Sequence, residues 1–389
     1  MKDRDYIIYI NTVDVKEVSG QGSFEKSLIS YLTNKFLDDD IQIFSVAKKN
    51  NKVNNKHYEI GINKSCKLSY LMYQIKLFYF LVKEIYNNKD KNIKMYVRIS
   101  PVNIVPFMIG KFCNIEITSR SGPFLQNLEI RHKVSKYIMP VFKTLLNFYF
   151  KNTSKIIVVT NKIKDVLIDD FNLDNNDIIV IPNPVDNNLF NKKVNQKFLS
   201  KENSFTISYI GSLYELQGVM DLIYAMNDIV NFKKIREIKL VIVGAGPLFE
   251  TIQNKIKEFK LENYITMIGN IPKEEIVKYI VNSNVCVATY TELANHYKGS
   301  SALKIMEYLY FNKFIIAANI EDYQFIEENK FGILYEVDNH KDLSLKIIDS
   351  FSNQKQLSIN SKEYVIKNRT QEHIFDLYIK IILGFNNDN

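Results

Sequence analysis

Short β-branched runs alternate with amphipathic helical stretches along the whole chain, and this alternation constrains the fold more than any other feature. We predict helices between most of the strands, for instance at 23–36 and 162–170. Near-continuous apolar strands separated by helices are typical of parallel sheets that are covered on both faces. The sequence therefore predicts an α/β protein. The predicted strands are residues 6–10, 41–46, 95–99, 115–118, 156–160, 178–181, 206–210, 239–243, 265–268, 285–289, 314–317 and 332–335.

A polar stretch rich in lysine and asparagine, residues 187–203, interrupts this rhythm before it starts again. The 389 residues also favour two domains. We predict a Rossmann-like domain over 1–195, a second over 203–365, and a C-terminal helix over 366–389 that can cross back to the first. Open parallel sheets bind ligands outside the carboxyl ends of their strands, so a site is expected in the loops there, with a cleft between the domains.

Cysteine and histidine usage excludes several classes of protein. Cys66, Cys113 and Cys286 are odd in number and far apart, and the five histidines show no metal-ligand spacing. We expect no disulfide framework, no metal and a reducing compartment. The apolar run near the N-terminus is too short for a signal-peptide core, and 77–82 is far below the ~18 residues of a membrane span. A cytoplasmic protein is expected.

Positive charge is concentrated in the first half of the chain. Residues 1–200 hold 30 basic and 19 acidic side chains, a balance of +11, whereas the whole chain carries +8. Within 41–164 there are 22 basic and 5 acidic side chains, a local +17. Such asymmetry indicates a polyanionic partner: nucleic acid, an anionic membrane surface or a phosphate-bearing substrate. Nothing in the sequence resembles a nucleic-acid recognition motif, which disfavours the first.

Two stretches in this basic region, 70–83 and 136–151, mix lysine with leucine, phenylalanine and tyrosine at helical spacing. An interfacial helix that docks on anionic lipid has this composition. A core helix with solvated lysines on its outer face has it too. The sequence leaves both interpretations open.

Glycine pairs precede two of the predicted helices. Gly20 and Gly22 form the first pair, but Glu25 stands where a dinucleotide fingerprint has its third glycine. Gly244 and Gly246 form the second pair, which lacks the third glycine in the same way. Nicotinamide binding is therefore disfavoured, and each pair alone indicates only a tight strand-to-helix turn.

Two further loops carry groups suited to an anion. Gly211 ends a predicted strand, and the turn 299–301 (Gly-Ser-Ser) opens a helix, where amides and hydroxyls can bind phosphate. Lys304 and Glu307 follow on one helix face. The lysine could neutralise a phosphate while the carboxylate accepts hydrogen bonds from a sugar diol. The alternative is a surface pair worth a few tenths of a kcal/mol.

Taken in order, five segments resemble motifs of the family 4 glycosyltransferases. Residues 211–225 are similar to the family's Gly-Arg-Leu…Lys-Gly-Val-Asp-x-Leu-Ile-x-Ala, and 240–247 to Leu-x-Ile-x-Gly-x-Gly-Pro. Residues 265–287 resemble Val-x-Phe-x-Gly-x-Val…Tyr…Ala-Asp-Val, and 303–317 resemble Lys-x-x-Glu-Tyr-Met-Ala-x-Gly-Lys-Pro-Val-Ile-Ala. In the first half, 180–190 resemble Val-Ile-Pro-Asn-Gly-Val-Asp…Phe. The resemblance implies the GT-B fold, in which two Rossmann-like domains face each other across a cleft.

The same resemblance implies a retaining, metal-independent hexosyltransferase. Its donor would be a UDP- or GDP-sugar, and its acceptor a glycan or lipid-linked glycan. A peripheral position on the inner face of the cell membrane would fit the basic region 41–164.

Site residues are carried over from the family motifs position by position. The implied catalytic residues are Glu307, which would hold the ribose hydroxyls, Lys304 beside the diphosphate, and Arg120, which corresponds only roughly to the family's first-domain residue. The implied donor-binding residues are Gly20 and Gly22 from the first domain, Gly211, Ser212 and Gln217, the base-binding Asn270 and Ile271, and Gly299, Ser300, Ser301 and Leu303.

Several positions depart from the family pattern. Its phosphate-binding arginine and lysine are Ser212 and Gln217 here, so Lys304 and Lys298 would have to supply the positive charge. The first of the family's two glutamates is Gly299, for which Glu292 is a candidate substitute, and Pro184 replaces a glycine. The alternatives are a sugar-nucleotide epimerase or phosphorylase of the same fold, a degenerate non-catalytic member, and a nucleic-acid-binding protein.

Overall fold

The computed structural model describes residues 4–14, 20–62, 67–100, 103–122, 137–185 and 204–385. The chain divides into two compact units. The first unit comprises Met1–Asn183 with Gln371–Asn389, and the second comprises Pro184–Thr370. The expected C-terminal segment 366–389 is thus shared: α14 (Lys362–Arg369) belongs to the second unit and α15 (Gln371–Leu383) to the first.

The first unit is built on an eight-stranded sheet in the order β3-β4-β2-β1-β5-β6-β7-β8, parallel except for the β3–β4 pair. Its strands are β1 (Asp5–Asn11), β2 (Ile41–Ala47), β3 (Asn51–Lys52), β4 (His57–Gly61), β5 (Asn92–Arg98), β6 (Glu116–Arg120), β7 (Lys155–Val158) and β8 (Ile178–Val180). The six strands predicted in this half are confirmed. Strands β3 and β4 were not predicted, because β3 has two polar residues and β4 buries His57 and Glu59.

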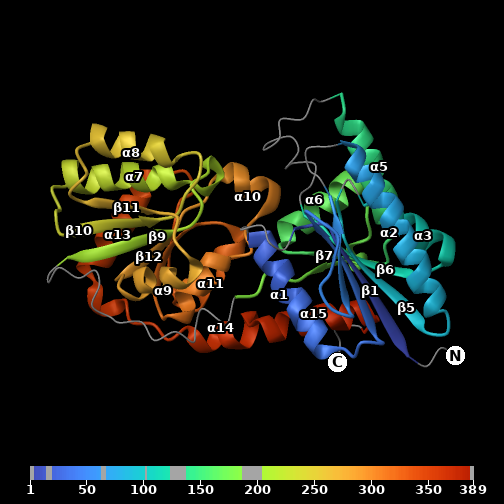
Figure 1. Cartoon of the computed structure of the whole chain (residues 1–389). Coiled ribbons are helices and arrows are strands. Elements are labelled where there is room, and N and C mark those ends of the chain that lie inside the picture. Colours follow the sequence, from blue (N-terminus) through green and yellow to red (C-terminus); the bar gives the residue numbers. More distant parts are fainter. Residues whose placement is uncertain are drawn as a thin grey trace. The chain divides into compact units, whose positions relative to one another are not determined.

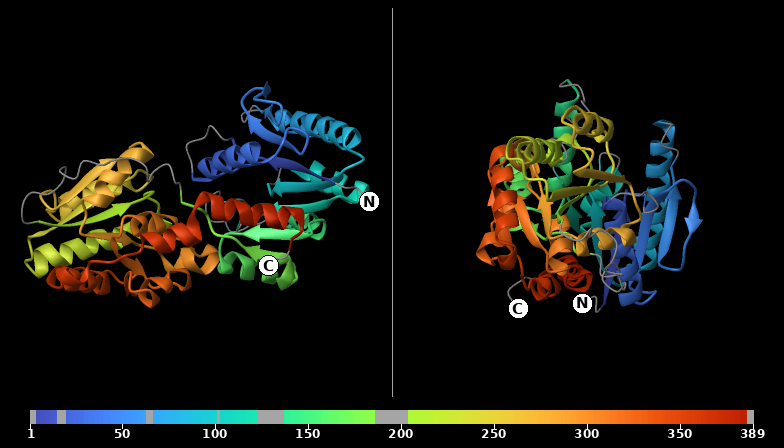
Figure 2. Two further views of the ribbon diagram at one scale, coloured as in Figure 1. Left: turned by 90° about the horizontal axis from the view of Figure 1, so that it is seen from below. Right: turned by 90° about the vertical axis from the view of Figure 1, so that its left-hand side faces the viewer.

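Helices cover both faces of this sheet (Figures 1 and 2). On one face α2 (Lys67–Asn87), α3 (Ile104–Cys113), α5 (Met139–Lys151) and α6 (Asn161–Phe171) pack with Ile8 and Ile10 of β1. On the other, α1 (Gly20–Lys35) and α15 pack with Ile7 and Tyr9 of the same strand. This alternation follows from the two-residue period of a strand, and it explains why β1 is apolar over 6–10.

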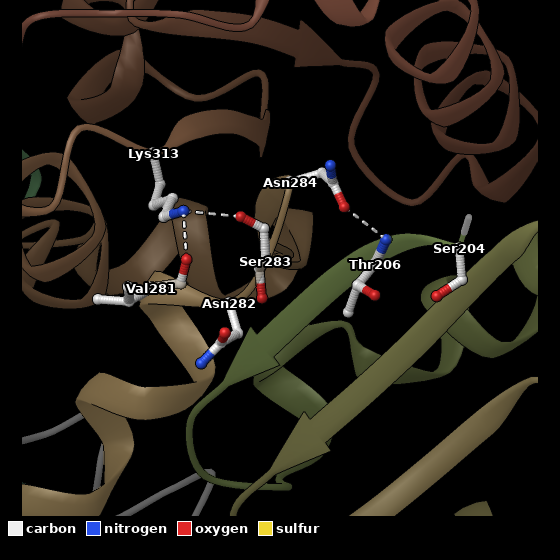
Figure 3. A pocket seen from close by; sticks show the side chains of 7 residues that line it. All are labelled: Ser204, Thr206, Val281, Asn282, Ser283, Asn284 and Lys313. Carbon is white, nitrogen blue, oxygen red and sulfur yellow. Dashed lines mark hydrogen bonds between the residues drawn. The ribbon is translucent and has the colours of Figure 1, made fainter. Parts of the chain in front are cut away.

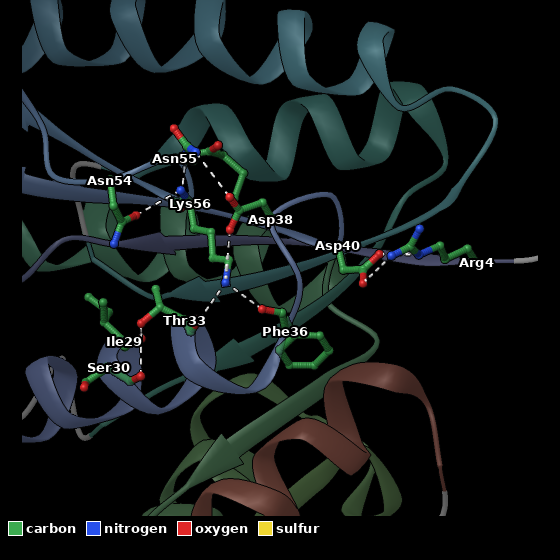
Figure 4. Close-up of polar contacts among 11 residues, drawn as sticks. Arg4, Ile29, Ser30, Thr33, Phe36, Asp38, Asp40, Asn54, Asn55 and Lys56 are labelled. Carbon is green, nitrogen blue, oxygen red and sulfur yellow. Dashed lines mark hydrogen bonds and ion pairs between the residues drawn. The ribbon is translucent and has the colours of Figure 1, made fainter.

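Lys56 holds the C-terminal end of α1 (Figure 4). Its Nζ donates to the carbonyl oxygens of Thr33 at 2.7 Å and Phe36 at 2.6 Å, and lies 3.2 Å from Asp38 Oδ1. The last carbonyls of a helix have no partner within the helix and carry partial negative charge, so a lysine there satisfies both needs. The ion pair of Arg4 with Asp40 ties the start of β1 to the turn before β2.

The second unit has a six-stranded parallel sheet in the order β11-β10-β9-β12-β13-β14. The helices α7, α8 and α13 lie on one face, and α9 and α11 on the other (Figure 1). The strand order reverses between β9 and β12, and the loops that follow these two strands flank the position where such sheets bind ligands. The strands are β9 (Phe205–Ile210), β10 (Ile238–Val243), β11 (Ile265–Gly269), β12 (Val285–Ala288), β13 (Phe314–Ala318) and β14 (Gly332–Tyr335). The helices are α7 (Val219–Asn227), α8 (Phe249–Glu258), α9 (Lys273–Val281), α10 (Glu292–Lys298), α11 (Leu303–Tyr310), α12 (Phe325–Glu328), α13 (His340–Ser352) and α14.

Candidate functional site

Glycine loops tie together three strand ends at the carboxyl edge of the second unit's sheet. The amide of Gly211, after β9, donates to Val243 O at 2.9 Å, and the amide of Gly244, after β10, donates to Gly269 O at 2.9 Å. A Cβ on Gly244 would lie 1.8 Å from Gly211 O, and a Cβ on Gly246 would lie 2.4 Å from the carbonyl oxygen of Leu213. These two glycines are therefore required for the close approach of one loop to the next.

Lys304, on the first turn of α11, reaches the loop that follows β9. Its Nζ donates to Gln217 Oε1 at 2.9 Å and lies 4.7 Å from the ring centroid of Tyr209. Gln217 ends the short 3-10 helix Glu215–Gln217, and a Cβ on Gly211 would lie 3.5 Å from the same Nζ. The structure thus brings Gly211, Gln217 and Lys304 together across the reversal between β9 and β12. Of the site residues in this group only the lysine is charged.

Glu307 follows Lys304 by one helical turn and is nearly buried, with 8% of its surface exposed. Residues three apart share a helix face, so a carboxylate and an ammonium group occur side by side on α11. Leu303 is half-buried and packs on the core of the unit. Ser212, after Gly211, accepts a hydrogen bond from Tyr209 Oη at its carbonyl oxygen, 3.1 Å away.

The turn before α11 is held by side chains from elsewhere in the unit. The Ser300 amide donates to Asp322 Oδ2 at 2.7 Å, and Tyr323 Oη donates to Ser300 Oγ at 2.7 Å. Tyr290 Oη donates to Gly299 O at 2.6 Å, and Gly299 has φ 54° and ψ −161°, which requires glycine. The Ser300 amide is therefore not free as expected, because it bonds to Asp322, whereas the Ser300 hydroxyl only accepts in these contacts. The role of this turn in binding phosphate stays a prediction.

Arg369 and Asp322 complete the support of this turn. Arg369 Nη1 donates to Ser301 O at 3.2 Å. Burial raises the pKa of Asp322, although the hydrogen bond from the Ser300 amide opposes this shift. Sequence reasoning missed Tyr290, Asp322, Tyr323 and Arg369, since none belongs to a recognisable motif and only the fold brings them to the turn.

The residues expected to bind the nucleotide base follow β11, the edge strand next to β10. Asn270 is exposed and Ile271 packs partly on the core. Gly269 before them has φ +83°, and its carbonyl oxygen accepts from Gly244. They therefore lie at the same edge of the sheet as Lys304, and their role in binding a base stays a prediction.

The two substitutes considered for missing family residues lie on α10. Glu292 is exposed at its start and accepts a 3.4 Å hydrogen bond from Asn295. The side chain of Lys298 is outside the described part of the structure.

In the first unit, Arg120 ends β6 and is buried, with 8% of its surface exposed. Its Nη1 lies 3.2 Å from Glu25 Oε1, its Nη2 donates to Asn183 Oδ1 at 2.7 Å, and its Cζ is 3.6 Å from the ring centroid of Phe24. The guanidinium group thus contacts protein groups on several sides. Its expected catalytic role stays a prediction.

Glu25 is the centre of this cluster and is fully buried. Besides Arg120, its carboxylate accepts hydrogen bonds from Arg98, at the end of β5, and from Tyr9 of β1. Burial and the adjacent Glu25 carboxylate raise the pKa of Tyr9, which keeps the phenol protonated as a donor. The sheet order of the first unit reverses between β1 and β5, so two arginines and a tyrosine hold one carboxylate at this point.

Gly20 and Gly22 lie in the first turn of α1, which begins at Gly20. They were expected in a loop before a helix that starts at residue 23 or 24, so that expectation is wrong. The sequence singled out Glu25 only as a missing glycine. Glu25 stands between Phe24 and Leu28, which are both buried. A charged residue between two such apolar residues of a helix is the signal that could have identified it.

A hollow of about 440 Å³ lies at the opposite edge of the second unit's sheet (Figure 3). Its lining includes Thr206 and Asn284, near the amino ends of β9 and β12. The Lys313 Nζ donates to Val281 O at 2.7 Å and to Ser283 O at 2.8 Å, so the lysine holds the backbone between α9 and β12 in place. No predicted site residue lines this hollow.

Within the described ranges, no three histidine, cysteine, aspartate or glutamate side chains are placed to hold a metal ion. Over the same ranges, no helix is both long and apolar enough to span a bilayer. Cys286 is buried, which raises its thiol pKa to about 12, whereas Cys113 is exposed and Cys66 lies outside the described residues.

Comparison with solved structures defines the class of fold. Sucrose-phosphate synthase from Thermosynechococcus elongatus aligns with a TM-score of 0.70 and 15% identity, over 97% of this chain and all of that one. Anabaena Alr3699/HepE, solved in complex with UDP and glucose, aligns with a TM-score of 0.71 and 13% identity, over 98% of this chain and all of that one. The fold is GT-B, the fold of these glycosyltransferases.

Sequence comparison adds a family. Residues 190–371 match the model of the glycosyl transferases group 1 family, and this segment lies almost entirely in the second unit. A UDP-Gal:alpha-D-GlcNAc-diphosphoundecaprenol alpha-1,3-galactosyltransferase of Escherichia coli is 27% identical over 64% of this chain and 66% of its own length. An uncharacterized glycosyltransferase of Methanocaldococcus jannaschii, MJ1069, is 22% identical over 65% of this chain and 63% of its own. The chain thus spans slightly less than two thirds of each of these relatives.

Proposed function

We propose that this protein is a glycosyltransferase that moves a hexose-type sugar from a nucleotide-sugar donor to a glycan or lipid-linked glycan acceptor. The observation that carries the proposal is the 2.9 Å contact of Lys304 with Gln217 at the reversal of the sheet, one turn from the buried Glu307. Both residues lie in the segment that matches the glycosyl transferases group 1 model. This combination offers a cation and a carboxylate where parallel sheets bind nucleotides.

Lys304 is the residue proposed to stabilise the leaving nucleoside diphosphate. Negative charge develops on the β-phosphate as the bond to the sugar breaks, and a pre-positioned ammonium group stabilises that charge. The N-terminal end of α11 adds a positive partial charge next to it. Glu307 is proposed to accept hydrogen bonds from the ribose hydroxyls, and the backbone at Asn270 and Ile271 to receive the base. Retention of configuration and metal independence belong to the same proposal.

The named relatives suggest which donor and acceptor to test first. The Escherichia coli relative is named for a UDP-galactose donor and a diphosphoundecaprenol-linked acceptor. The similar Anabaena structure contains UDP and glucose. We therefore propose a UDP-sugar donor, with GDP-sugars as the alternative, and a lipid-linked acceptor. A cytoplasmic protein that works at the inner face of an anionic membrane follows from such an acceptor and from the basic region 41–164.

The test separates phosphate binding from nucleoside binding. The Lys304→Ala variant should bind UDP about ten- to a hundredfold more weakly, because a charge-assisted hydrogen bond is lost, and should bind uridine as the wild type does. The Glu307→Ala variant should weaken both ligands, because both carry the ribose. The control is Lys257→Ala, which removes an exposed lysine in the last turn of α8, at the end of the helix away from the glycine loop. Equal weakening of UDP and uridine by Lys304→Ala contradicts the phosphate role.

A degenerate, non-catalytic subunit is the second candidate, because the neutral Ser212 and Gln217 stand where the family pattern has cations. A thermal-shift panel of UDP, GDP, ADP, CMP, NADH and a short RNA, with and without EDTA, distinguishes the two. A ligand at 100 times its dissociation constant adds about 2.7 kcal/mol of stability. Stabilisation by one nucleoside diphosphate, unchanged by EDTA, supports a catalytic transferase. If no nucleotide stabilises the protein, the result supports a non-catalytic subunit. Donor consumption without acceptor would indicate an epimerase, and a requirement for free phosphate a phosphorylase.

A further inference from the structure

The outer face of α2 exposes a continuous row of large apolar side chains. Of the 21 exposed large hydrophobic residues in the described part of the chain, eight lie on this helix. All eight are between 45% and 71% exposed. Tyr79 and Met72 lie beside the row and widen it. Six of the eight, spaced three or four apart, define what we call the α2 stripe: Leu68, Leu71, Ile75, Phe78, Val82 and Tyr86.

The stripe is separate from the core contact of the same helix. Tyr73, Leu77 and Leu81 face the sheet and are 1% exposed or less. From Leu68 to Tyr86 the stripe runs about 27 Å at 1.5 Å per residue. A surface helix of a soluble protein ordinarily places polar residues opposite its core face. A contiguous apolar patch in their place marks a surface on which something docks.

Charges around the stripe indicate which partner it fits. Lys76 and Lys83 both lie on one side of the stripe, roughly 90–115° from its mean direction, since each residue advances about 100° around a helix, and the exposed Lys89 follows. The acidic residue on α2, Glu84, turns toward the sheet and accepts a 2.9 Å hydrogen bond from Tyr6 Oη. An apolar row bordered by lysines matches a bilayer with anionic headgroups. A second copy of the chain would bring the same lysines against each other, so it fits less well.

Neighbouring helices extend the apolar surface. Phe112 on α3, which packs beside α2, is 81% exposed, and Met108 of the same helix is 41% exposed. Val141, on the first turn of α5, is 66% exposed, and Lys143 follows it on the surface. These side chains lie on helices that cover the same face of the sheet (Figure 1). The apolar surface therefore belongs to one side of the first unit.

We propose that the α2 stripe docks the first unit on an anionic lipid surface, with α2 lying in the plane of the interface. The apolar row would enter the acyl boundary, Lys76 and Lys83 would contact headgroup phosphates, and the phenols of Tyr79 and Tyr86 would sit at headgroup level. This inference rests on the proposed function in one respect: a lipid-linked acceptor is carried by such a surface.

Vesicle flotation of the full chain tests the proposal without donor or acceptor. The wild type should bind vesicles of equal parts phosphatidylcholine and phosphatidylglycerol at least about tenfold more tightly than phosphatidylcholine alone, and less tightly as salt rises. The triple variant Ile75→Ser, Phe78→Ser and Val82→Ser should lose this binding. The matched control, Phe232→Ser, Leu345→Ser and Ile366→Ser, removes three apolar side chains of the second unit that are at least as exposed as Val82, and it should bind as the wild type does.

A second variant separates the charge from the apolar row. Lys76→Gln with Lys83→Gln should weaken binding to anionic vesicles several-fold and reduce its dependence on salt, while the weak binding to neutral vesicles stays unchanged. Circular dichroism melts of each variant establish that it is folded, which the exposure of the changed side chains leads us to expect.

Three results would overturn the proposal: no vesicle binding by the wild type, equal binding to neutral and anionic vesicles, or undiminished binding by a folded triple serine variant. A dimer in sedimentation equilibrium that the serine variant disperses, without vesicle binding, would assign the stripe to a second copy. UDP binding is measured separately in the absence of lipid. Its failure refutes the proposed function and leaves the vesicle result unaffected.

Discussion

Lys304 Nζ donates a 2.9 Å hydrogen bond to Gln217 Oε1, which joins α11 to the loop after β9. The acceptor is a neutral amide, so it positions the ammonium group without neutralising it. A glutamine at this place orients the cation that the loop itself lacks.

Replacing this acceptor should change nucleotide binding in a graded way. Gln217→Glu places a carboxylate within reach of Lys304 and neutralises it, so we expect UDP affinity to fall about tenfold. Gln217→Ala removes the anchor but leaves the charge, and the expected loss is about threefold. Titration calorimetry with UDP measures both. A Gln217→Glu variant with wild-type affinity would show that Lys304 does not contact phosphate.

Removing the carboxylate at the centre of the first unit should be severely destabilising. Glu25→Gln leaves the partly buried Arg98 and the buried Arg120 beside a neutral amide, and breaking a buried ion pair costs about 3–5 kcal/mol. Denaturant unfolding gives the change in free energy. The exposed Glu274 on α9 provides the control, since Glu274→Gln should change stability by less than about 0.5 kcal/mol. A Glu25→Gln variant as stable as this control would contradict the assigned role.

Adding a side chain to a glycine should destabilise the protein where two of the glycine loops touch. Gly244 has φ +148°, and a Cβ there would lie 1.8 Å from Gly211 O, so Gly244→Ala must displace one of the loops. We expect a loss of about 2–3 kcal/mol in thermal unfolding, together with weaker UDP binding. Gly122→Ala, where a Cβ meets nothing within 4 Å, is the matched control and should be nearly neutral. Equal stability of the two variants would show that the loops rearrange at little cost.

The carboxylate that holds the Ser300 turn should make stability depend on pH. Burial raises the pKa of Asp322, so the folded chain binds a proton there more readily than the unfolded chain does. The associated stability is present at low pH and is lost as pH rises through the raised value. Asp322→Asn keeps an oxygen acceptor for the Ser300 amide and does not titrate.

The stability of Asp322→Asn relative to the wild type should therefore be greater at pH 7 than at pH 4. Unfolding by urea at both values measures this difference. Asp349→Asn, at an exposed position on α13, should show no such trend. A relative stability of Asp322→Asn that is greater at pH 4 would reverse the assigned direction.

The twelve predicted strands were readable because a strand buried on both faces is apolar along most of its length, as β1 is over 6–10 and β10 over 240–243. Strand β4 was not readable, since its pairing with β2 depends on burying His57 and Glu59, and a sequence pattern does not reveal partners for polar residues. The start of α1 was misplaced for a related reason. Glycine disfavours a helix by local propensity, yet Gly20 and Gly22 are helical where the helix packs on the sheet.

The sequence by itself determined the class of fold, the positions of the strands and the resemblance that singled out Lys304 and Glu307, because these depend on local periodicity and on order along the chain. The tertiary structure alone decided that Gln217 orients Lys304, that Asp322 occupies the Ser300 amide and that Glu25 joins two arginines. It also decided how residues 70–83 are placed: one face of α2 packs on the core and the other exposes an apolar row. Contacts between residues far apart in sequence, and the direction in which a helix face points, arise only when the sheet is assembled.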